Sequence, residues 1–363
     1  MDNRFIYKVL NSGIKRNASD IHLTNKLKPM LRIDGELIEL ENFEENTPEL
    51  LKSCVKAILK ESDYEKYSKR KQVDTSMEYG DRRFRVHVYR QMGCDAFSLR
   101  LIPKIIPKFS SMNLPPVLQK FTTVQNGLVL ITGTTGSGKS TTLASLIGEI
   151  NEKQKKHIIT VEDPIEFVHE HKNSMINQRE VGTDVLSFSD AVIAAMREDP
   201  DILLVGEMRD MDTIANAITM AETGHLVFGT LHTKSVSESV DRIIDVFPST
   251  QQEQVRLQLA NTIEGIVSQQ LLPKVGGGRV PVCEILIPDD AMRNLIREQA
   301  SPNTITDQMQ IKAKKTGSQT RLQDFVKLLT SGLITEETAL NNIDVDKNEF
   351  LKMVEIYKRG GNI

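Results

Sequence analysis

A run of eight residues constrains the fold of this chain more than any other segment. Residues 133–140 read GTTGSGKS and match the pattern GxxxxGK[ST] in full. The apolar stretch GLVLIT leads into the run, and STTLASLIGEI, which is compatible with a helix, follows it. Glycines allow backbone N–H groups to converge on phosphate oxygens without Cβ clashes, and the dipole of the following helix favours a bound anion. The run therefore predicts a phosphate-binding loop between a buried strand and a helix.

We expect the loop to contact a nucleotide along its whole length, through Gly133, Thr134, Thr135, Gly136, Ser137, Gly138, Lys139, Ser140 and Thr141. Lys139 is expected to reach the β and γ phosphates, and Ser140 to ligate Mg²⁺. A flexible turn of glycine and serine is the alternative interpretation. The complete match and its flanking strand and helix argue against that alternative.

The chain after the loop has the pattern of an α/β fold. Short apolar runs at 128–132, 157–161, 202–205 and 226–230 alternate with helical segments. This alternation is typical of a parallel sheet that is covered on both faces. We assign residues 117–290 to this core and residues 291–363 to a C-terminal helical region. The final GGNI is expected to be mobile.

Residues 1–103 predict a smaller α+β unit. We expect a helix that ends near Asn17, strands at 20–24, 29–33 and 36–40, and a hairpin turn at Asp34-Gly35. We also expect a helix at 50–59 and strands near 84–88 and 96–102. Four prolines between 103 and 116 mark residues 104–116 as the linker between the two domains.

Composition excludes several classes of function. The net charge of −3, the 5% of aromatic residues and the absence of Trp argue against a nucleic-acid-binding protein. Three cysteines far apart in the sequence suggest a reduced, cytoplasmic protein without a disulfide framework or a zinc site. No apolar run approaches the roughly 18 residues of a membrane span, so we expect no direct membrane insertion.

Acidic and histidine side chains follow or flank the predicted core strands. Glu162 and Glu207 stand at the carboxyl ends of two strands, where open α/β sheets bind ligands. A carboxylate there can polarise a water molecule for phosphoryl transfer, or it can serve as a helix N-cap or solvated loop acid. His225 and His232 bracket the strand at 226–230. Each could contact a phosphate or have a structural role.

The motifs together resemble the secretion and type IV pilus ATPase family. In order, GTTGSGKST, VEDPIEFVH, MREDPDILLVGEMRD and ETGHLVFGTLHT correspond to its Walker A motif, Asp box, Walker B motif and His box. ASDIHL, RIDG and RFRVHVY resemble its N-terminal PAS-like domain. The resemblance implies a RecA-like ATPase core, with Glu162 as general base, Glu207 as the Walker B carboxylate and metal-side ligand, and His232 at the γ-phosphate.

Within that family, the sequence is most similar to the pilus retraction ATPases. The chain begins almost directly with the PAS-like domain, lacks a tetracysteine insertion after the His box, and reads AMRNLIRE at 291–298. The last segment differs at one position from AIRNLIRE, a motif associated with retraction. A pilus-assembly or type II secretion ATPase is the nearest alternative. An inactive nucleotide-binding regulator and a RecA-like nucleic-acid translocase are further alternatives.

Family members offer arginines from the first domain to ATP that is bound by a neighbouring subunit. Arg85 and Arg100 match such positions. Where the family pattern often has another arginine, this sequence has Met92-Gly93, and Arg90 could substitute from a shifted position. A surface charge on a strand is the alternative interpretation of these arginines.

The resemblance implies a homohexamer that uses ATP and Mg²⁺. Its domains would close about the linker when ATP binds, as in hinge closure around a ligand. Successive closures would drive a pilus platform protein of the inner membrane, with other pilus ATPases as possible partners. The motor would then lie at the cytoplasmic face of that membrane.

Two substitutions test the assignment of the loop and of the Walker B carboxylate. Lys139→Ala should remove nucleotide binding, because the ammonium that pairs with the phosphates is lost. Glu207→Gln should still bind ATP and barely hydrolyse it. Titration with a fluorescent ATP analogue and a phosphate-release assay measure the two properties. Normal turnover by Glu207→Gln would overturn the assignment of that carboxylate.

Overall fold

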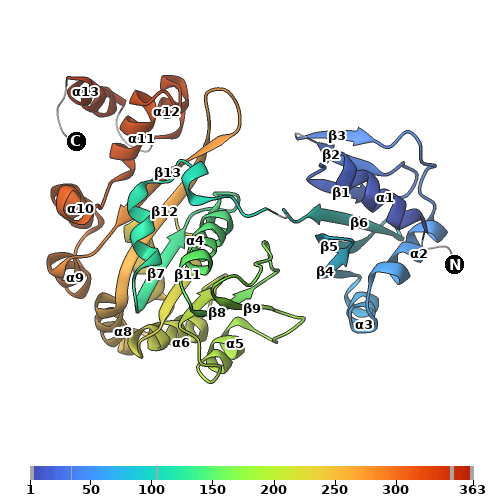
Figure 1. Cartoon of the computed structure of the whole chain (residues 1–363), viewed down its shortest axis with the longest axis horizontal. Helices are drawn as coiled ribbons and strands as arrows, with labels where there is room; N and C mark the ends of the chain where they lie inside the picture. Colours follow the sequence, from blue (N-terminus) through green and yellow to red (C-terminus); the bar gives the residue numbers. More distant parts are fainter. Residues whose placement is uncertain (1–3, 34, 104, 344–346, 360–363) are drawn as a thin grey trace. The chain divides into compact units, whose positions relative to one another are not determined.

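The computed structural model of the chain describes residues 4–33, 35–103, 105–343 and 347–359. Asp34 of the predicted hairpin turn and the predicted mobile GGNI end lie outside these residues. The chain divides into two compact units, residues 1–105 and 106–363, whose elements are labelled in Figure 1. Each unit has its own apolar core.

Within residues 4–33 and 35–103, the first unit is built from helices on an antiparallel sheet. Its helices are α1 (Arg4–Lys15), α2 (Pro48–Ile58) and α3 (Glu61–Arg70). Its strands are β1 (Asp20–Leu23), β2 (Met30–Ile33), β3 (Glu36–Glu39), β4 (Gln72–Tyr79), β5 (Arg82–Gln91) and β6 (Cys94–Leu101). The sheet order is β3-β2-β1-β6-β5-β4. The predicted strands and helices of this unit are confirmed within a few residues, whereas α3 and β4 were not predicted.

Alternating burial gives this first sheet one apolar face and one polar face. In β5, Phe84, Val86 and Val88 are fully buried, and the residues between them are polar and partly exposed. The apolar face packs on α1 and α2, whose residues belong to the same core. A strand with this alternation has one face against the core, as the sequence predicted.

Within residues 106–343 and 347–359, the second unit contains a seven-stranded sheet. Its strands are β7 (Gly127–Thr132), β8 (His157–Glu162), β9 (Met175–Glu180), β10 (Ile202–Val205), β11 (Leu226–Leu231), β12 (Ile263–Pro273) and β13 (Arg279–Leu286). Their order is β13-β12-β7-β11-β10-β8-β9. Neighbouring strands are parallel except for β12 and β13, which form an antiparallel pair.

The four predicted strands are parallel to one another, as expected, and the antiparallel pairing of β12 with β13 makes the whole sheet mixed. The strands predicted at 128–132, 157–161, 202–205 and 226–230 correspond to β7, β8, β10 and β11. The sequence did not predict β12, because the polar run Ser268 to Gln270 interrupts its apolar pattern. It did not predict β9 either, since MINQRE has few apolar residues.

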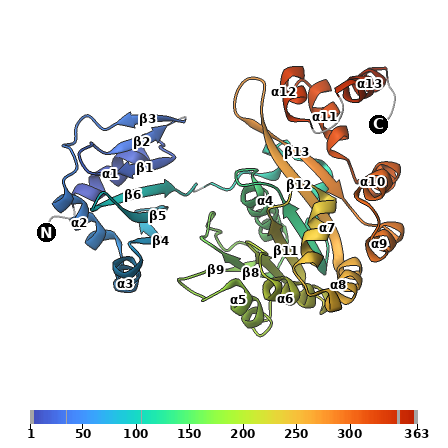
Figure 2. The same ribbon diagram turned by 180° about the vertical axis from the view of Figure 1, so that it is seen from behind.

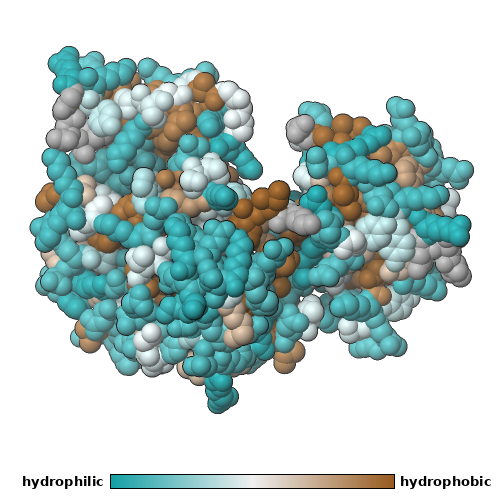
Figure 3. All heavy atoms as spheres, viewed as in Figure 1, coloured by the Kyte–Doolittle hydropathy of each residue, from teal (hydrophilic) through white to brown (hydrophobic). Residues whose placement is uncertain are grey.

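Helices cover both faces of this second sheet, as Figures 1 and 2 show from opposite sides. One core joins a sheet face to α4 (Lys139–Lys153) and to the short 3₁₀ helices at Phe109–Ser111 and Pro116–Thr122. Another core joins the opposite face to α5 (Phe188–Ala195), α6 (Met211–Glu222), α7 (Val236–Asp245), α8 (Ser249–Thr262), α9 (Asp290–Arg297) and α10 (Pro302–Thr316). The surface shown in Figure 3 is mostly hydrophilic, since the apolar residues of the strands are buried in these cores.

The C-terminal region is helical, as predicted. In addition to α9 and α10, it contains α11 (Arg321–Thr330), α12 (Glu336–Asn342) and α13 (Lys347–Lys358). Met292 and Ile296, on the inward face of α9, are 2% and 1% exposed. The last three helices pack on the outer ends of β12 and β13 in a core that includes Phe325 and Phe350.

The stretch predicted as a linker is partly ordered on the second unit. Within this stretch, Phe109 and Leu114 are buried in the core that contains α4. Ile105, by contrast, is 80% exposed. The role of residues 104–116 as a joint remains a prediction. Among the described residues, no helix is long and apolar enough to cross a membrane.

Asp324 in α11 is a buried carboxyl group beneath the antiparallel pair. It accepts a hydrogen bond of 2.8 Å from the backbone N–H of Cys283 in β13. Burial raises the pKa of Asp324 from 3.8 to about 6. The folded chain therefore binds this proton more tightly than the unfolded chain does.

This difference predicts a pH-dependent stability. The free energy of unfolding should fall as the pH rises from about 4 to about 6, by on the order of 3 kcal/mol from Asp324 alone. Asp324→Asn keeps an oxygen acceptor for the N–H of Cys283 but has no carboxyl group to titrate. Its free energy of unfolding should therefore not fall between about pH 4 and about pH 6, and its stability relative to the natural chain should rise over this range. Urea unfolding at several pH values measures the effect, with the exposed Asp307→Asn as control. Parallel pH curves for the natural chain and Asp324→Asn would contradict the prediction.

Candidate functional site

The carboxyl ends of adjacent parallel strands meet at one edge of the second sheet. Thr132 at the end of β7 pairs with Leu231 at the end of β11. Val205 at the end of β10 pairs with Val161, next to the end of β8. The residues that follow these strands therefore lie side by side. They include the phosphate-binding loop and three predicted catalytic side chains, Glu162, Glu207 and His232.

The loop at 133–138 is tightly packed on the strand beside it. Gly133 and Gly138 have φ values of +144° and +90°, which other residues rarely adopt. A Cβ atom on Gly133 would lie 2.3 Å from the backbone oxygen of Gln269, and one on Gly138 would lie 2.8 Å from the Gln269 side-chain nitrogen. The helix α4 begins at Lys139, directly after this turn. Loop and helix thus have the form that cradles phosphate oxygens with backbone N–H groups.

The side chain of Lys139 contacts the backbone of the loop. Its Nζ donates hydrogen bonds to the carbonyl oxygens of Gly133 at 2.7 Å and Thr134 at 3.2 Å. Burial lowers the pKa of Lys139, and the nearby carboxylates of Glu207 and Glu166 oppose this shift. A bound polyphosphate would supply further negative charge and stabilise the ammonium form. The loop and Lys139 therefore fit a nucleoside triphosphate.

Glu207 and His232 contact each other at the same edge. His232 Nε2 lies 2.8 Å from Glu207 Oε1, and Arg209 donates to the same oxygen. Glu207 follows β10 by two residues, and His232 directly follows β11. Ser140 is in the first turn of α4, as the motif requires for a hydroxyl that ligates Mg²⁺. Ser140 and Glu207, the two predicted metal ligands, thus both lie in segments that follow strands at this edge.

Glu162 is oriented by hydrogen bonds from two strands. Thr160 Oγ1 donates to Glu162 Oε1 at 2.7 Å, and Gln178 Nε2 donates to the same oxygen at 3.2 Å. The backbone N–H of Glu166 approaches the other oxygen at 3.4 Å. Burial raises the pKa of Glu162, while these hydrogen bonds act in the opposite direction. A partly desolvated carboxylate in fixed orientation is suited to accept a proton from water.

The structure places His225 away from this site. His225 precedes β11, and its backbone oxygen accepts a hydrogen bond from Gly127, the first residue of β7. About six strand residues, or roughly 20 Å, separate it from the edge where the loop lies. Its ring is near the carbonyl oxygen of Met220 at 3.1 Å. The two ends of a strand lie at opposite edges of a sheet, so the structure does not bring His225 to the loop. Its predicted contact with the nucleotide has no support in this arrangement.

Arg85 and Arg100, the two arginines predicted to act on a neighbour, share one row of the first unit's sheet. Arg85 in β5 pairs with Arg100 in β6, which pairs with Asp20 in β1. Arg100 Nε donates to Asp20 Oδ1 at 2.9 Å, and 65% of the Arg100 side chain is exposed. Arg90 instead contacts Asp95 within its own unit, at 3.2 Å. The proposal that Arg85 and Arg100 act on a neighbouring subunit remains a prediction.

Sequence reasoning missed the two side chains that orient Glu162. Thr160 stands two residues before Glu162 on the same strand, so the period of two places both on one face. That spacing could have identified Thr160. Gln178 belongs to β9, which was not predicted, and no pattern in the sequence pairs it with β8.

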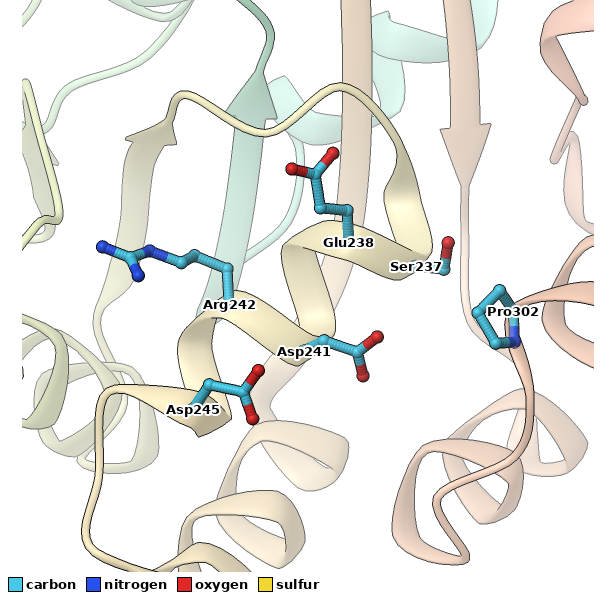
Figure 4. A pocket seen from close by; sticks show the side chains of 6 residues that line it. All are labelled: Ser237, Glu238, Asp241, Arg242, Asp245 and Pro302. Atoms are coloured by element: carbon cyan, nitrogen blue, oxygen red, sulfur yellow. The ribbon is translucent and has the colours of Figure 1, made fainter. Parts of the chain in front are cut away.

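A cavity of about 270 Å³ lies along α7, and none of its lining residues belongs to the loop. It is lined by Ser237, Glu238, Asp241, Arg242, Asp245 and Pro302 (Figure 4). Burial raises the pKa of Asp241, and Asp245 adds to this shift. Three carboxyl groups make this cavity unfavourable for polyphosphate. The chemistry of phosphate binding therefore points to the sheet edge and not to this cavity.

Comparison with known proteins gives concordant matches. The family described as type II/IV secretion system protein matches residues 2–277. The type IV pilus retraction ATPase PilT of Pseudomonas aeruginosa is 42% identical over 355 residues, which cover 94% of this chain and 99% of that protein. A twitching motility protein of Neisseria gonorrhoeae is 44% identical over 315 residues, covering 86% of this chain and 83% of that protein.

Among solved structures, the crystal structure of the pilus retraction motor PilT with bound ADP is similar in fold. It has a TM-score of 0.88 and 46% sequence identity, and the match covers 96% of this chain and 99% of that chain. The similarity therefore includes both units.

The hydrogen bond from Gln178 predicts a measurable effect on Glu162. Gln178→Leu removes a donor that favours the ionised carboxylate, so the pKa of Glu162 should shift upward. NMR titration of ¹³C-labelled glutamate side chains measures this, with Glu162→Gln to identify the resonance. Gln258→Leu is a matched control, because Gln258 donates to Glu222 on another face of the unit at 2.8 Å. An unchanged or lower pKa in Gln178→Leu would contradict the assigned contact.

Proposed function

Since this chain belongs to the family of type II/IV secretion system proteins, we propose that it is an ATP-hydrolysing motor that powers retraction of type IV pili. The observation that carries the proposal is the 42% identity to a pilus retraction ATPase over nearly the full length of both proteins. The convergence of Lys139, Glu162, Glu207 and His232 at one sheet edge supports hydrolysis at this site.

In the proposed reaction, water attacks the γ-phosphorus of ATP and releases ADP and phosphate. The loop N–H groups and Lys139 hold the β and γ phosphates, and Glu162 accepts a proton from the attacking water. His232, held by Glu207, donates a hydrogen bond to a γ-phosphate oxygen. Ser140 and Glu207 are the residues that would hold Mg²⁺. The bound ion supplies positive charge for the oxygens that become more negative during transfer.

Arginines from a neighbouring copy complete the proposed site. Arg85 and Arg100 are cross-strand neighbours, so both can face one bound polyphosphate. Asp20 holds Arg100 until a stronger anion competes for the guanidinium. Such sharing requires assembly, and we propose a homohexamer on the basis of the family resemblance. Hydrolysis would then depend on how the subunits are docked.

The proposed motor works at the cytoplasmic face of the inner membrane. There it would act on a pilus platform protein, with other pilus ATPases as further partners. ATP binding would close the two units about the stretch at 104–116, and ADP release would let them reopen. A pilus-assembly or secretion ATPase of the same family would use the same chemistry for the opposite movement or for export.

Two measurements test this proposal together. Purified protein should hydrolyse ATP with a specific activity that rises with protein concentration to a plateau, because each site needs a neighbour. Glu207→Gln serves as the blank. In the source organism, cells with Glu207→Gln as the sole copy should keep surface pili and fail to retract them.

The outcomes separate the alternatives. Loss of surface pili in the Glu207→Gln cells would point to an assembly ATPase and overturn the retraction proposal. No activity above the blank at any concentration would overturn hydrolysis by the isolated protein and favour a regulator. If the specific activity does not change with protein concentration, a sizing experiment shows whether the protein is already assembled. A fully active monomer would refute sites that are shared between subunits.

A further inference from the structure

The side chain of Gln269 in β12 lies directly beneath the phosphate-binding loop. Its Nε2 donates a hydrogen bond to the backbone oxygen of Ser137 at 2.7 Å. Its Oε1 accepts a hydrogen bond from Thr142 Oγ1 at 2.9 Å. One amide group thus joins the last part of the loop to the first turn of the helix that follows. One N–H of the amide and its oxygen are thus both engaged.

All three partners are removed from solvent. Gln269 and Ser137 are each 3% exposed, and Thr142 is fully buried. In such a site water cannot replace a lost partner, so removal of one group leaves its buried partner without a hydrogen bond. The amide is the kind of group this position requires, because the Ser137 oxygen needs a donor and the Thr142 hydroxyl needs an acceptor.

The same residue also limits the space around the loop. The backbone oxygen of Gln269 lies under Gly133, and its side chain lies under Gly138, where any Cβ would collide. β12 pairs with β7 through Ser268 and Thr132, immediately before these contacts. The strand therefore continues past the end of β7 and supports the loop from below.

We propose that Gln269 is a positioning residue for nucleotide binding, which holds the backbone of the phosphate-binding loop in the form that accepts phosphate. It does not touch the nucleotide. The donor to Ser137 fixes the peptide that precedes Gly138 and Lys139. The acceptor for Thr142 fixes the start of α4, whose N–H groups face the phosphates. This inference rests on nucleotide binding by the loop and is independent of pilus retraction.

Gln269→Glu gives a test with a reversible readout. The ionised carboxylate would face the Ser137 oxygen without a proton to donate, and burial would raise its pKa. Affinity for a fluorescent ATP analogue should fall by on the order of 100-fold at pH 8.5, as expected when a buried acceptor loses its partner beside a repelling charge. Protonation at pH 6 restores the donor, so affinity should recover at least roughly tenfold.

Gln270→Glu is the matched control. Gln270 is the next residue on the same strand, and its side chain contacts Asn342 in α12 at 3.5 Å, away from the loop. The charged groups near the loop, Lys139, Glu207 and Glu166, are the same in both variants. Gln270→Glu should therefore bind the analogue like the natural chain at both pH values.

Thr142→Val adds a second variant of unchanged shape. It removes only the donor to Gln269 Oε1, and affinity should fall by roughly tenfold at every pH. Equal affinity of Gln269→Glu and Gln270→Glu, or a loss in Gln269→Glu that does not recover at pH 6, would overturn the inference. Absence of binding by the natural chain would instead refute the proposed ATPase.

Discussion

The parallel pairing of β7, β11, β10 and β8 is the constraint on which the rest of the second unit depends. The carboxyl ends of parallel strands lie at one edge of the sheet. The residues that follow these strands therefore lie close together, although they are far apart in the sequence. The loop after β7 contributes phosphate-binding N–H groups. The ends of the other strands contribute Glu162, Glu207 and His232. A different strand order would disperse these side chains without changing any of them.

Packing then fixes the edge in detail. Both sheet faces are covered, with α4 in one core and α5 to α10 in the other, so the strand ends have little freedom to shift. On this rigid base, buried polar contacts set the orientation of individual groups. Thr160 and Gln178 orient Glu162, and Gln269 supports the loop. The site thus consists of groups that contact the nucleotide and of buried groups that fix the orientation of those contacting groups.

The sequence predicted the parts of this arrangement that depend on local pattern. The loop at 133–140, the apolar strands and the acids at their ends have signals within a few residues of one another. His225 shows the limit of such reasoning, because a flanking position does not say at which edge a residue emerges. Gln178 and Gln269 were beyond reach for another reason. Their partners are 16 and 132 residues away, and only the tertiary fold brings them together.

Binding of nucleotide at the carboxyl edge of the second sheet can be measured by hydrogen–deuterium exchange. The full chain is compared with and without a non-hydrolysable ATP analogue and Mg²⁺. Exchange should slow at residues 133–140 and just after β8, β10 and β11. The amino end of β11, around His225, should be unchanged. Slower exchange along the α7 cavity, with no change at residues 133–140, would show that the nucleotide binds elsewhere.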